Sequence, residues 1–234
     1  MNTGDASRAG RFALAILAVS LLLGAAPASE VRVTAVDALA RLRAGNERFV
    51  KDASAIVPLG PTTRQALATG QNPFATILSC ADSRVPPEYI FNTGLGELFV
   101  IRAAGEVVDR SVMASLEYGA EHLHTPLLVV MGHGSCGAVK AAVDRAALQG
   151  PNLQFLVSAI RAGITRSSSE RHELRAAILA NVEQVINDAL GGSQILRHAV
   201  QSASLQVVGA YYELSSGRVM FSEPASASPT ASHK

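Results

Sequence analysis

The sequence is poor in charged residues, cysteine and tryptophan, and these shortages narrow the range of functions. Asp, Glu, Lys and Arg make up 17% of the 234 residues, the net charge is +1, and there is no run of Lys or Arg. A phosphate backbone requires a basic surface, so we expect no nucleic-acid partner. After the first 28 residues, no apolar segment is long enough to span a bilayer. The remaining chain suits one globular domain with a substantial core, since 48% of all residues are apolar.

The first 28 residues have the pattern of a secretory signal peptide. Arg8 and Arg11 precede an apolar run at 12–23, and Ala26-Pro27-Ala28 supplies the small residues that a signal peptidase needs. An uncleaved membrane anchor is the alternative, but the run is short for a full span. We therefore expect cleavage after Ala28 and an exported protein, periplasmic or secreted, without a stable membrane anchor.

Three short, unbroken apolar runs predict the centre of the fold. The runs at 74–79, 98–103 and 127–132 are typical of strands buried on both faces. Helical patterns at 111–123 and 138–148 lie between or after them. This alternation predicts an α/β domain with a mainly parallel central sheet flanked by helices.

Other segments complete the expected domain, which extends over 29–223. A hairpin signal, Ser215-Ser216-Gly217, lies between apolar segments at 206–212 and 218–221. Residues 224–234, rich in Pro, Ala, Ser and Thr, are expected to be a disordered tail. Further helices are predicted at 34–50, with Thr34 as N-cap, and at 152–164, 170–189 and 193–202.

Two cysteines and one histidine are the first candidates for a chemical site. Cys80 follows the first apolar run, and the motif His133-Gly134-Ser135-Cys136 follows the third. In an exported chain with two cysteines, a disulfide between Cys80 and Cys136 is the first hypothesis. The alternative is a metal site, because α/β sheets bind ligands beyond the carboxyl ends of their strands, and two thiolates with one imidazole suit zinc. Three protein ligands leave a fourth position open, as in catalytic zinc sites.

Asp82 and Arg84 add charged groups next to the first cysteine. Asp82 lies two residues after Cys80, so in extended backbone the two side chains point to the same side. Its carboxylate is then placed to reach the fourth position of the metal or to hydrogen-bond a water there. Arg84 offers a two-pronged donor that would hold Asp82 off the metal as an ion pair. A surface ion pair without a further role is the alternative.

These residues resemble the motifs of the β-class carbonic anhydrases. Cys80-Ala81-Asp82-Ser83-Arg84 matches the family's C-x-D-x-R motif, and His133-Gly134-Ser135-Cys136 matches its H-x-x-C motif, in the same order. The stretches FNTGLGELFVIRAAGEVV and SLEYGAEHL are similar to the family's intervening segments. The likeness covers roughly residues 34–221.

The resemblance implies a zinc enzyme that hydrates carbon dioxide reversibly to bicarbonate and a proton, through attack by zinc-bound hydroxide. Residues 29–223 would be the catalytic domain of a homodimer or tetramer, with the helix at 34–50 as an arm that packs on a neighbouring subunit. One Zn²⁺ is expected per subunit. The implied ligands are Cys80, His133 and Cys136, and the implied catalytic dyad is Asp82 and Arg84.

Two departures from the family pattern bear on activity. Glu106 stands where the family usually has asparagine, and a carboxylate near the site would shift the pKa of the metal-bound water or slow turnover. We expect instead that Glu106 points to solvent or pairs with Arg102 or Arg110. The absence of tryptophan excludes the regulatory bicarbonate pocket that some bacterial members build around this residue.

Three other functions stay open at this stage. The same scaffold hydrolyses carbon dioxide analogues, carbonyl sulfide or carbon disulfide, in some members of the family. A catalytically silent zinc- or bicarbonate-binding protein is a second possibility, although the presence of both Asp82 and Arg84 argues against it. An exported binding domain with a Cys80–Cys136 disulfide is the third.

Overall fold

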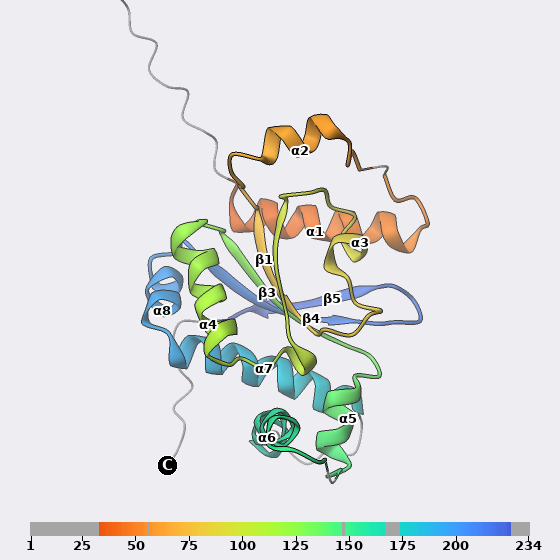
Figure 1. Cartoon of the computed structure of the whole chain (residues 1–234), viewed down its shortest axis with the longest axis vertical. Helices are drawn as coiled ribbons and strands as arrows, with labels where there is room; N and C mark the ends of the chain where they lie inside the picture. The colour runs from red at the N-terminus through yellow and green to blue at the C-terminus, as the bar shows by residue number, and fades with distance from the viewer. Residues whose placement is uncertain (1–32, 56, 147, 167–173, 226–234) are drawn as a thin grey trace, which may run out of the picture. The chain divides into compact units, whose positions relative to one another are not determined.

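Five β-strands form one sheet in the computed structural model, which describes residues 33–55, 57–146, 148–166 and 174–225. The strands are β1 (Ala75–Ser79), β2 (Leu98–Arg102), β3 (Leu127–His133), β4 (Gln206–Tyr212) and β5 (Val219–Pro224). Their order is β2-β1-β3-β4-β5, and every neighbouring pair is parallel except β4 with β5 (Figure 1). From β1 the chain passes first to β2, which lies on one side of β1, and then to β3, which lies on the other side of β1. The adjacent ends of β1 and β3 are therefore a switch point, where such sheets bind ligands.

The prediction of an α/β domain with a mainly parallel sheet is confirmed. The three apolar runs form β1, β2 and β3, and the predicted hairpin is formed by β4 and β5. Every residue of β1 and β3 is buried. The expectation of burial on both faces is wrong for β2, which is only partly buried because it lies at the edge of the sheet.

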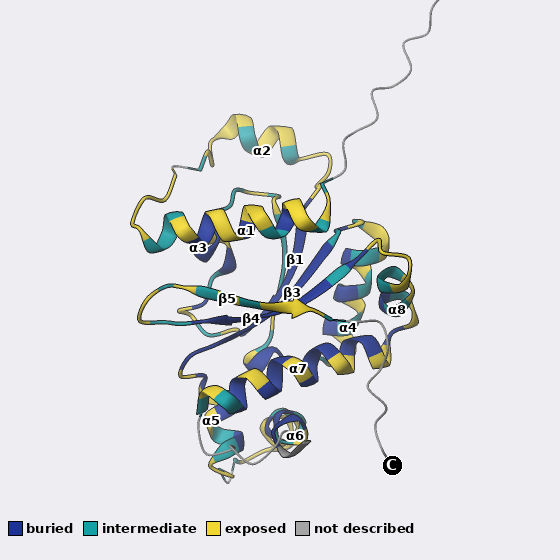
Figure 2. Ribbon diagram, turned by 180° about the vertical axis from the view of Figure 1, so that it is seen from behind, coloured by how far each residue is buried: buried dark blue, intermediate teal, exposed yellow. Residues whose placement is uncertain are grey.

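Helix α1 (Ala35–Val50) covers one face of the sheet, with a buried and an exposed side (Figure 2). It begins at the predicted N-cap, where the Thr34 hydroxyl accepts a hydrogen bond from the Asp37 amide. Ala38 and Leu42 are fully buried, whereas Val36 is 72% exposed. Thus α1 packs on the sheet of its own chain, and its packing on a neighbouring subunit stays a prediction. Three short helical segments follow α1 in the chain: α2 (Pro61–Leu67), α3 (Pro87–Ile90) and η1 (Ala104–Glu106).

The opposite face of the sheet is covered by a second group of helices, of which α7 runs across the strands (Figure 1). Ten of the 19 residues of this helix are buried, because the sheet packs against one side of it and α5 and α6 pack against another. The helices of this group are α4 (Arg110–Glu117), α5 (Gly137–Val143), α6 (Pro151–Arg166), α7 (Leu174–Gly192) and α8 (Gln194–Gln201).

Two predicted helices differ in their extent. The helix expected at 111–123 consists of α4 followed by a π-helical turn, η2 (Tyr118–His122). The helix expected at 138–148 ends already at Val143, because the backbone becomes left-handed at Arg145, with φ 50°.

The predicted signal peptide at 1–28 lies outside the described residues, as does most of the predicted tail. The strand β5 includes Pro224, and the Ala225 amide donates to the Val207 carbonyl, so backbone pairing continues two residues into the segment assigned to the tail. Among the described helices, none has the length and apolar character that crossing a membrane requires.

Candidate metal centre

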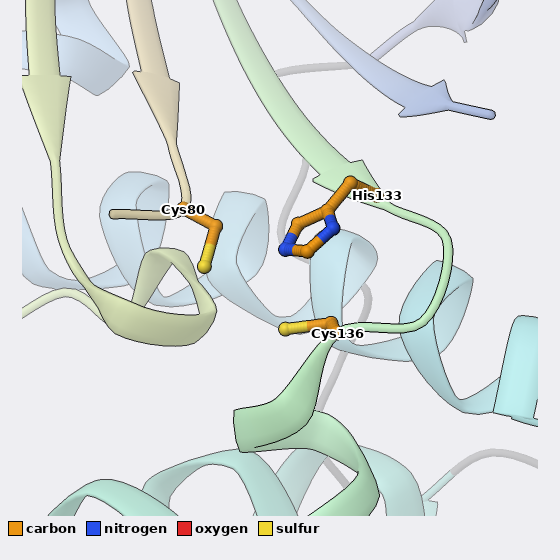
Figure 3. A group of neighbouring side chains, drawn as sticks. All are labelled: Cys80, His133 and Cys136. Carbon is orange, nitrogen blue, oxygen red and sulfur yellow. The ribbon is translucent and has the colours of Figure 1, made fainter. Parts of the chain in front are cut away.

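Two adjacent strand ends and one helix start bring three metal-binding side chains together. Cys80 directly follows β1, His133 ends β3, and Cys136 is the N-cap residue of α5. The backbone turns sharply between the last two at Ser135, which has a left-handed φ of 56°. One potential ligand atom from each of the three side chains lies within 4.8 Å of the other two, and Figure 3 shows the side chains directed at a common space. The structure thus assembles the three residues that the sequence analysis named as zinc ligands.

The His133 imidazole is fully buried and oriented as a metal ligand would be. Its Nδ1 lies 2.9 Å from the Gly134 carbonyl oxygen, which only accepts hydrogen bonds, so Nδ1 carries the proton. Nε2 therefore has the free lone pair, and it has no hydrogen-bond partner among the described residues. A buried polar atom without a partner is destabilising unless something binds it. A metal ion at Nε2 satisfies this requirement.

Both cysteines are free thiols, so the disulfide considered from the sequence is not formed. The hydrogen bond from Cys136 is the largest of the effects that lower the pKa of the Cys80 thiol to about 4. The same hydrogen bond, together with burial, raises the pKa of the Cys136 thiol. Metals bind thiolates, and this pocket stabilises one thiolate before any metal binds. Two sulfurs and one imidazole nitrogen therefore fit Zn²⁺, with one coordination position left for a small ligand.

Asp82 and Arg84 form a two-pronged ion pair beside the three ligands. Arg84 Nε donates to Asp82 Oδ1 at 2.9 Å, and Nη2 donates to Oδ2 at 2.7 Å. This hydrogen-bonded guanidinium holds the pKa of the Asp82 carboxyl well below its usual range. Oδ2 also lies 3.9 Å from His133 Nε2, and the Asp82 side chain is 18% exposed. The carboxylate therefore borders both the ligand set and the solvent, while Arg84 holds it.

Arg102, at the end of β2, is a positioning residue that the sequence analysis missed. Its Nε donates to the Cys80 carbonyl at 3.1 Å, and its Nη2 donates to the Asp82 carbonyl at 2.5 Å. These bonds fix the backbone that carries the first ligand and the carboxylate. The signal lay in the strand register, since Arg102 pairs with Ser79, the residue before Cys80.

Glu106 is fully buried, so the expectation that it points to solvent or pairs with an arginine is wrong. The turn that carries it folds inward toward α7, where Asn181 donates to Glu106 Oε1 at 2.9 Å. Oε2 has no hydrogen-bond partner in the described part of the chain. Burial is the main cause that raises the pKa of Glu106 to about 8, and the charge of Cys80 adds to it. At neutral pH the side chain is thus mainly a neutral acid, which avoids a further negative charge near the Cys80 thiolate.

Comparison with known proteins places these residues in a family context. A family model described as "Carbonic anhydrase" matches residues 75–219, a segment that contains the three candidate ligands together with Asp82 and Arg84. The chain is 36% identical over 192 residues to carbonic anhydrase 2 of Mycobacterium tuberculosis, a match that covers 76% of this chain and 88% of that protein. It is 35% identical over 189 residues to the carbonic anhydrase of Mycolicibacterium smegmatis, with the same two coverages.

Solved structures with a similar fold agree with the sequence matches. One is the Coccomyxa β-carbonic anhydrase in complex with acetazolamide, with a TM-score of 0.64 and 29% identity over 80% of this chain and 88% of that one. Another belongs to the tetrameric β-carbonic anhydrases of Sordaria macrospora, with a TM-score of 0.62 and 25% identity over 70% of this chain and 87% of that one.

Proposed function

The chain belongs to the β-class carbonic anhydrase family, and on this premise we propose that it hydrates carbon dioxide reversibly to bicarbonate and a proton, with zinc as cofactor. The observation that carries the proposal is the convergence of Cys80, His133 and Cys136, whose ligand atoms lie within 4.8 Å of one another. The free Nε2 of His133 supports a metal at this place rather than a cluster of core side chains.

Cys80, His133 and Cys136 would hold one Zn²⁺ per subunit. When bound, zinc supplies a positive charge that lowers the pKa of a coordinated water from about 16 to near 7, which makes a nucleophile available at neutral pH. The chain's part is to keep the ligands ready. The hydrogen bond from His133 Nδ1 to the Gly134 carbonyl fixes the ring and its tautomer.

Asp82 would orient the attacking water. Because Arg84 pairs with it, the carboxylate stays ionised over the working pH range and only accepts hydrogen bonds. A water that donates to Asp82 keeps a lone pair free to form the new bond to the carbon of carbon dioxide. Bicarbonate then leaves, and the proton released in the balanced reaction passes to buffer.

Stopped-flow measurement of carbon dioxide hydration, from about pH 6.5 to 9, tests this function around the expected pKa. We expect the rate to rise with pH, one zinc per chain, and loss of the rate when a chelator removes the metal. Zinc-loaded protein without activity at any pH would contradict the proposal. Carbonyl sulfide and carbon disulfide would then be the substrates to test with the same protein.

We further propose that the protein is exported and acts as a homo-oligomer. The signal-like segment at 1–28 supports export, and the Sordaria macrospora enzymes, described as tetrameric, support an oligomer. N-terminal sequencing of protein from the periplasmic fraction should begin at Ser29. Light scattering should give a mass of two or four chains, and a monomer would contradict the assembly.

A further inference from the structure

The turn formed by Gly105 and Glu106 reaches the Cys80 sulfur through a backbone amide. The Gly105 N–H donates to Cys80 Sγ at 3.3 Å in a buried contact. Both turn residues are left-handed, with φ 60° for Gly105 and φ 45° for Glu106. A non-glycine residue adopts this conformation at a cost in free energy, so the surroundings must hold the turn in place.

Packing encloses the turn on two sides. A Cβ at Gly105 would lie 2.6 Å from Ile160 Cδ1 on α6, so a side chain at this left-handed position would be strained and would displace Ile160. On the other side α7 approaches β3 closely at Gly132, where a Cβ would lie 2.8 Å from two α7 side chains and 3.4 Å from Glu106 Oε1. The turn therefore sits between the sheet and two helices, without access to water.

Asn181 of α7 provides the polar contacts that hold the turn. Its Nδ2 donates to the Gly105 carbonyl and to Glu106 Oε1, both at 2.9 Å. Asn181 is 1% exposed and Glu106 is fully buried. The Asn181 amide thus fixes both residues of the turn, and the N–H of one of them, Gly105, contacts the sulfur.

We propose that Asn181 and Glu106 are positioning residues for the Cys80 thiolate: they hold the Gly105 amide on the sulfur. This inference rests on the proposed role of Cys80 as a zinc ligand. An N–H donor draws electron density from a thiolate, so the sulfur donates less charge to a bound metal. Less charge donation leaves the metal more able to acidify its water, which favours activity near neutral pH.

Cobalt(II) in place of zinc gives a readout other than activity. In the cobalt-loaded Asn181→Ala protein, we expect the sulfur-to-cobalt charge-transfer band to move to longer wavelength, because the sulfur has lost its hydrogen bond. We also expect metal affinity to fall about 10-fold or more, because the turn no longer holds the sulfur in place. The midpoint of the pH–rate profile should rise, because the sulfur donates more charge to the metal.

Asn46→Ala is the matched control. Asn46 is also a buried asparagine whose Nδ2 donates to two carbonyl groups, those of Ile90 and Gly217. It lies on α1, which packs on the other face of the sheet from α7. Its cobalt band should stay at the wild-type position. An unshifted band in Asn181→Ala, or an equal shift in Asn46→Ala, would overturn the inference while leaving the proposed function intact.

A second variant and a second measurement keep the inference testable. Wild-type protein without a sulfur-to-cobalt band would overturn the metal site itself and hence the proposed function. If Asn181→Ala does not fold, Asn181→Ser is judged by the same criterion. In wild-type protein loaded with cadmium-113, a scalar coupling between the metal and the Gly105 amide proton is expected across the hydrogen bond, and its absence would contradict the proposal.

Discussion

Asp82 and Glu106 are two carboxylic acids beside the same three ligands, and their surroundings shift their pKa values in opposite directions. Asp82 borders solvent and forms a two-pronged ion pair with Arg84, which holds the pKa of Asp82 well below the usual range. Glu106 is fully buried and receives one hydrogen bond from an uncharged amide, and burial raises its pKa to about 8. Side-chain type alone therefore predicts neither charge nor role. The environment produces one permanent anion, which we propose orients water, and one mainly neutral acid, which we propose supports the Cys80 ligand.

Metal removal should have the largest effect, because both carboxylates act through the three ligands. Dialysis against a zinc chelator should reduce hydration of carbon dioxide to the rate of buffer, and zinc content should fall from one per chain to near zero. Adding zinc back under reducing conditions should restore the rate, which serves as the control. Activity that survives in zinc-free protein would remove the basis for comparing the two carboxylates at all.

Asp82→Asn should reduce kcat by about 10²–10⁴-fold at unchanged zinc content, because the amide no longer offers the ionised acceptor that orients the water. The measurement is stopped-flow hydration at pH 8 alongside metal analysis. Asp144→Asn is the matched control, since Asp144 is an exposed aspartate paired with Lys140 on α5. Its activity should stay within about twofold of wild type. Equal activity of Asp82→Asn and wild type would mean that the Asp82 carboxylate has no catalytic role.

Arg84→Lys should have a smaller effect, about 10-fold in kcat, since lysine keeps the charge but cannot grip both carboxylate oxygens. Zinc content should not change. Arg64→Lys, at an arginine of α2 that bonds only to the Leu59 carbonyl among the described contacts, is the control. If Arg84→Lys matches wild type, charge alone holds Asp82 and the two-pronged geometry is unimportant.

The sequence predicts the fold and the ligand set because both depend on local patterns. Short apolar runs predict strands, and residues that directly follow two such runs meet at one edge of a parallel sheet. Cys80 and His133 satisfy this condition through adjacent β1 and β3, and the H-x-x-C spacing adds Cys136. Asp82 and Arg84 are two residues apart, so their pairing was also accessible from the sequence.

The contacts of the residues around the ligands, Glu106, Asn181 and Arg102, could not be predicted because they join segments that are distant in the sequence. Glu106 and Asn181 are 75 positions apart and meet only because α7 crosses the sheet beneath η1. From the sequence, Asn181 is one polar residue in the apolar stretch AAILANV. The role of Arg102 required the register of β2 against β1.

Glu106→Gln tests the difference between the two carboxylates most directly, and the quantity to measure is the free energy of unfolding rather than the rate. The unfolded chain releases the Glu106 proton near pH 4.5, whereas the folded protein keeps it to about pH 8. The folded state therefore binds more protons in this window, and wild-type stability falls as pH rises, by roughly 1 kcal/mol per pH unit. Glutamine cannot ionise, so the variant does not lose stability in this way. The unfolding free energy of Glu106→Gln minus that of wild type should therefore increase from pH 5 to pH 8.

Urea unfolding of zinc-loaded wild type and Glu106→Gln at pH 5, 6.5 and 8 measures this difference. The unpartnered Oε2 becomes an amide nitrogen in the variant, and this adds an offset that does not depend on pH. Glu88→Gln, at an exposed glutamate of α3, should change the unfolding free energy by less than about 0.5 kcal/mol at every pH. A constant difference between wild type and Glu106→Gln across the three pH values would show that Glu106 is ionised throughout. Both carboxylates would then be anions, and burial would not have made Glu106 a neutral acid.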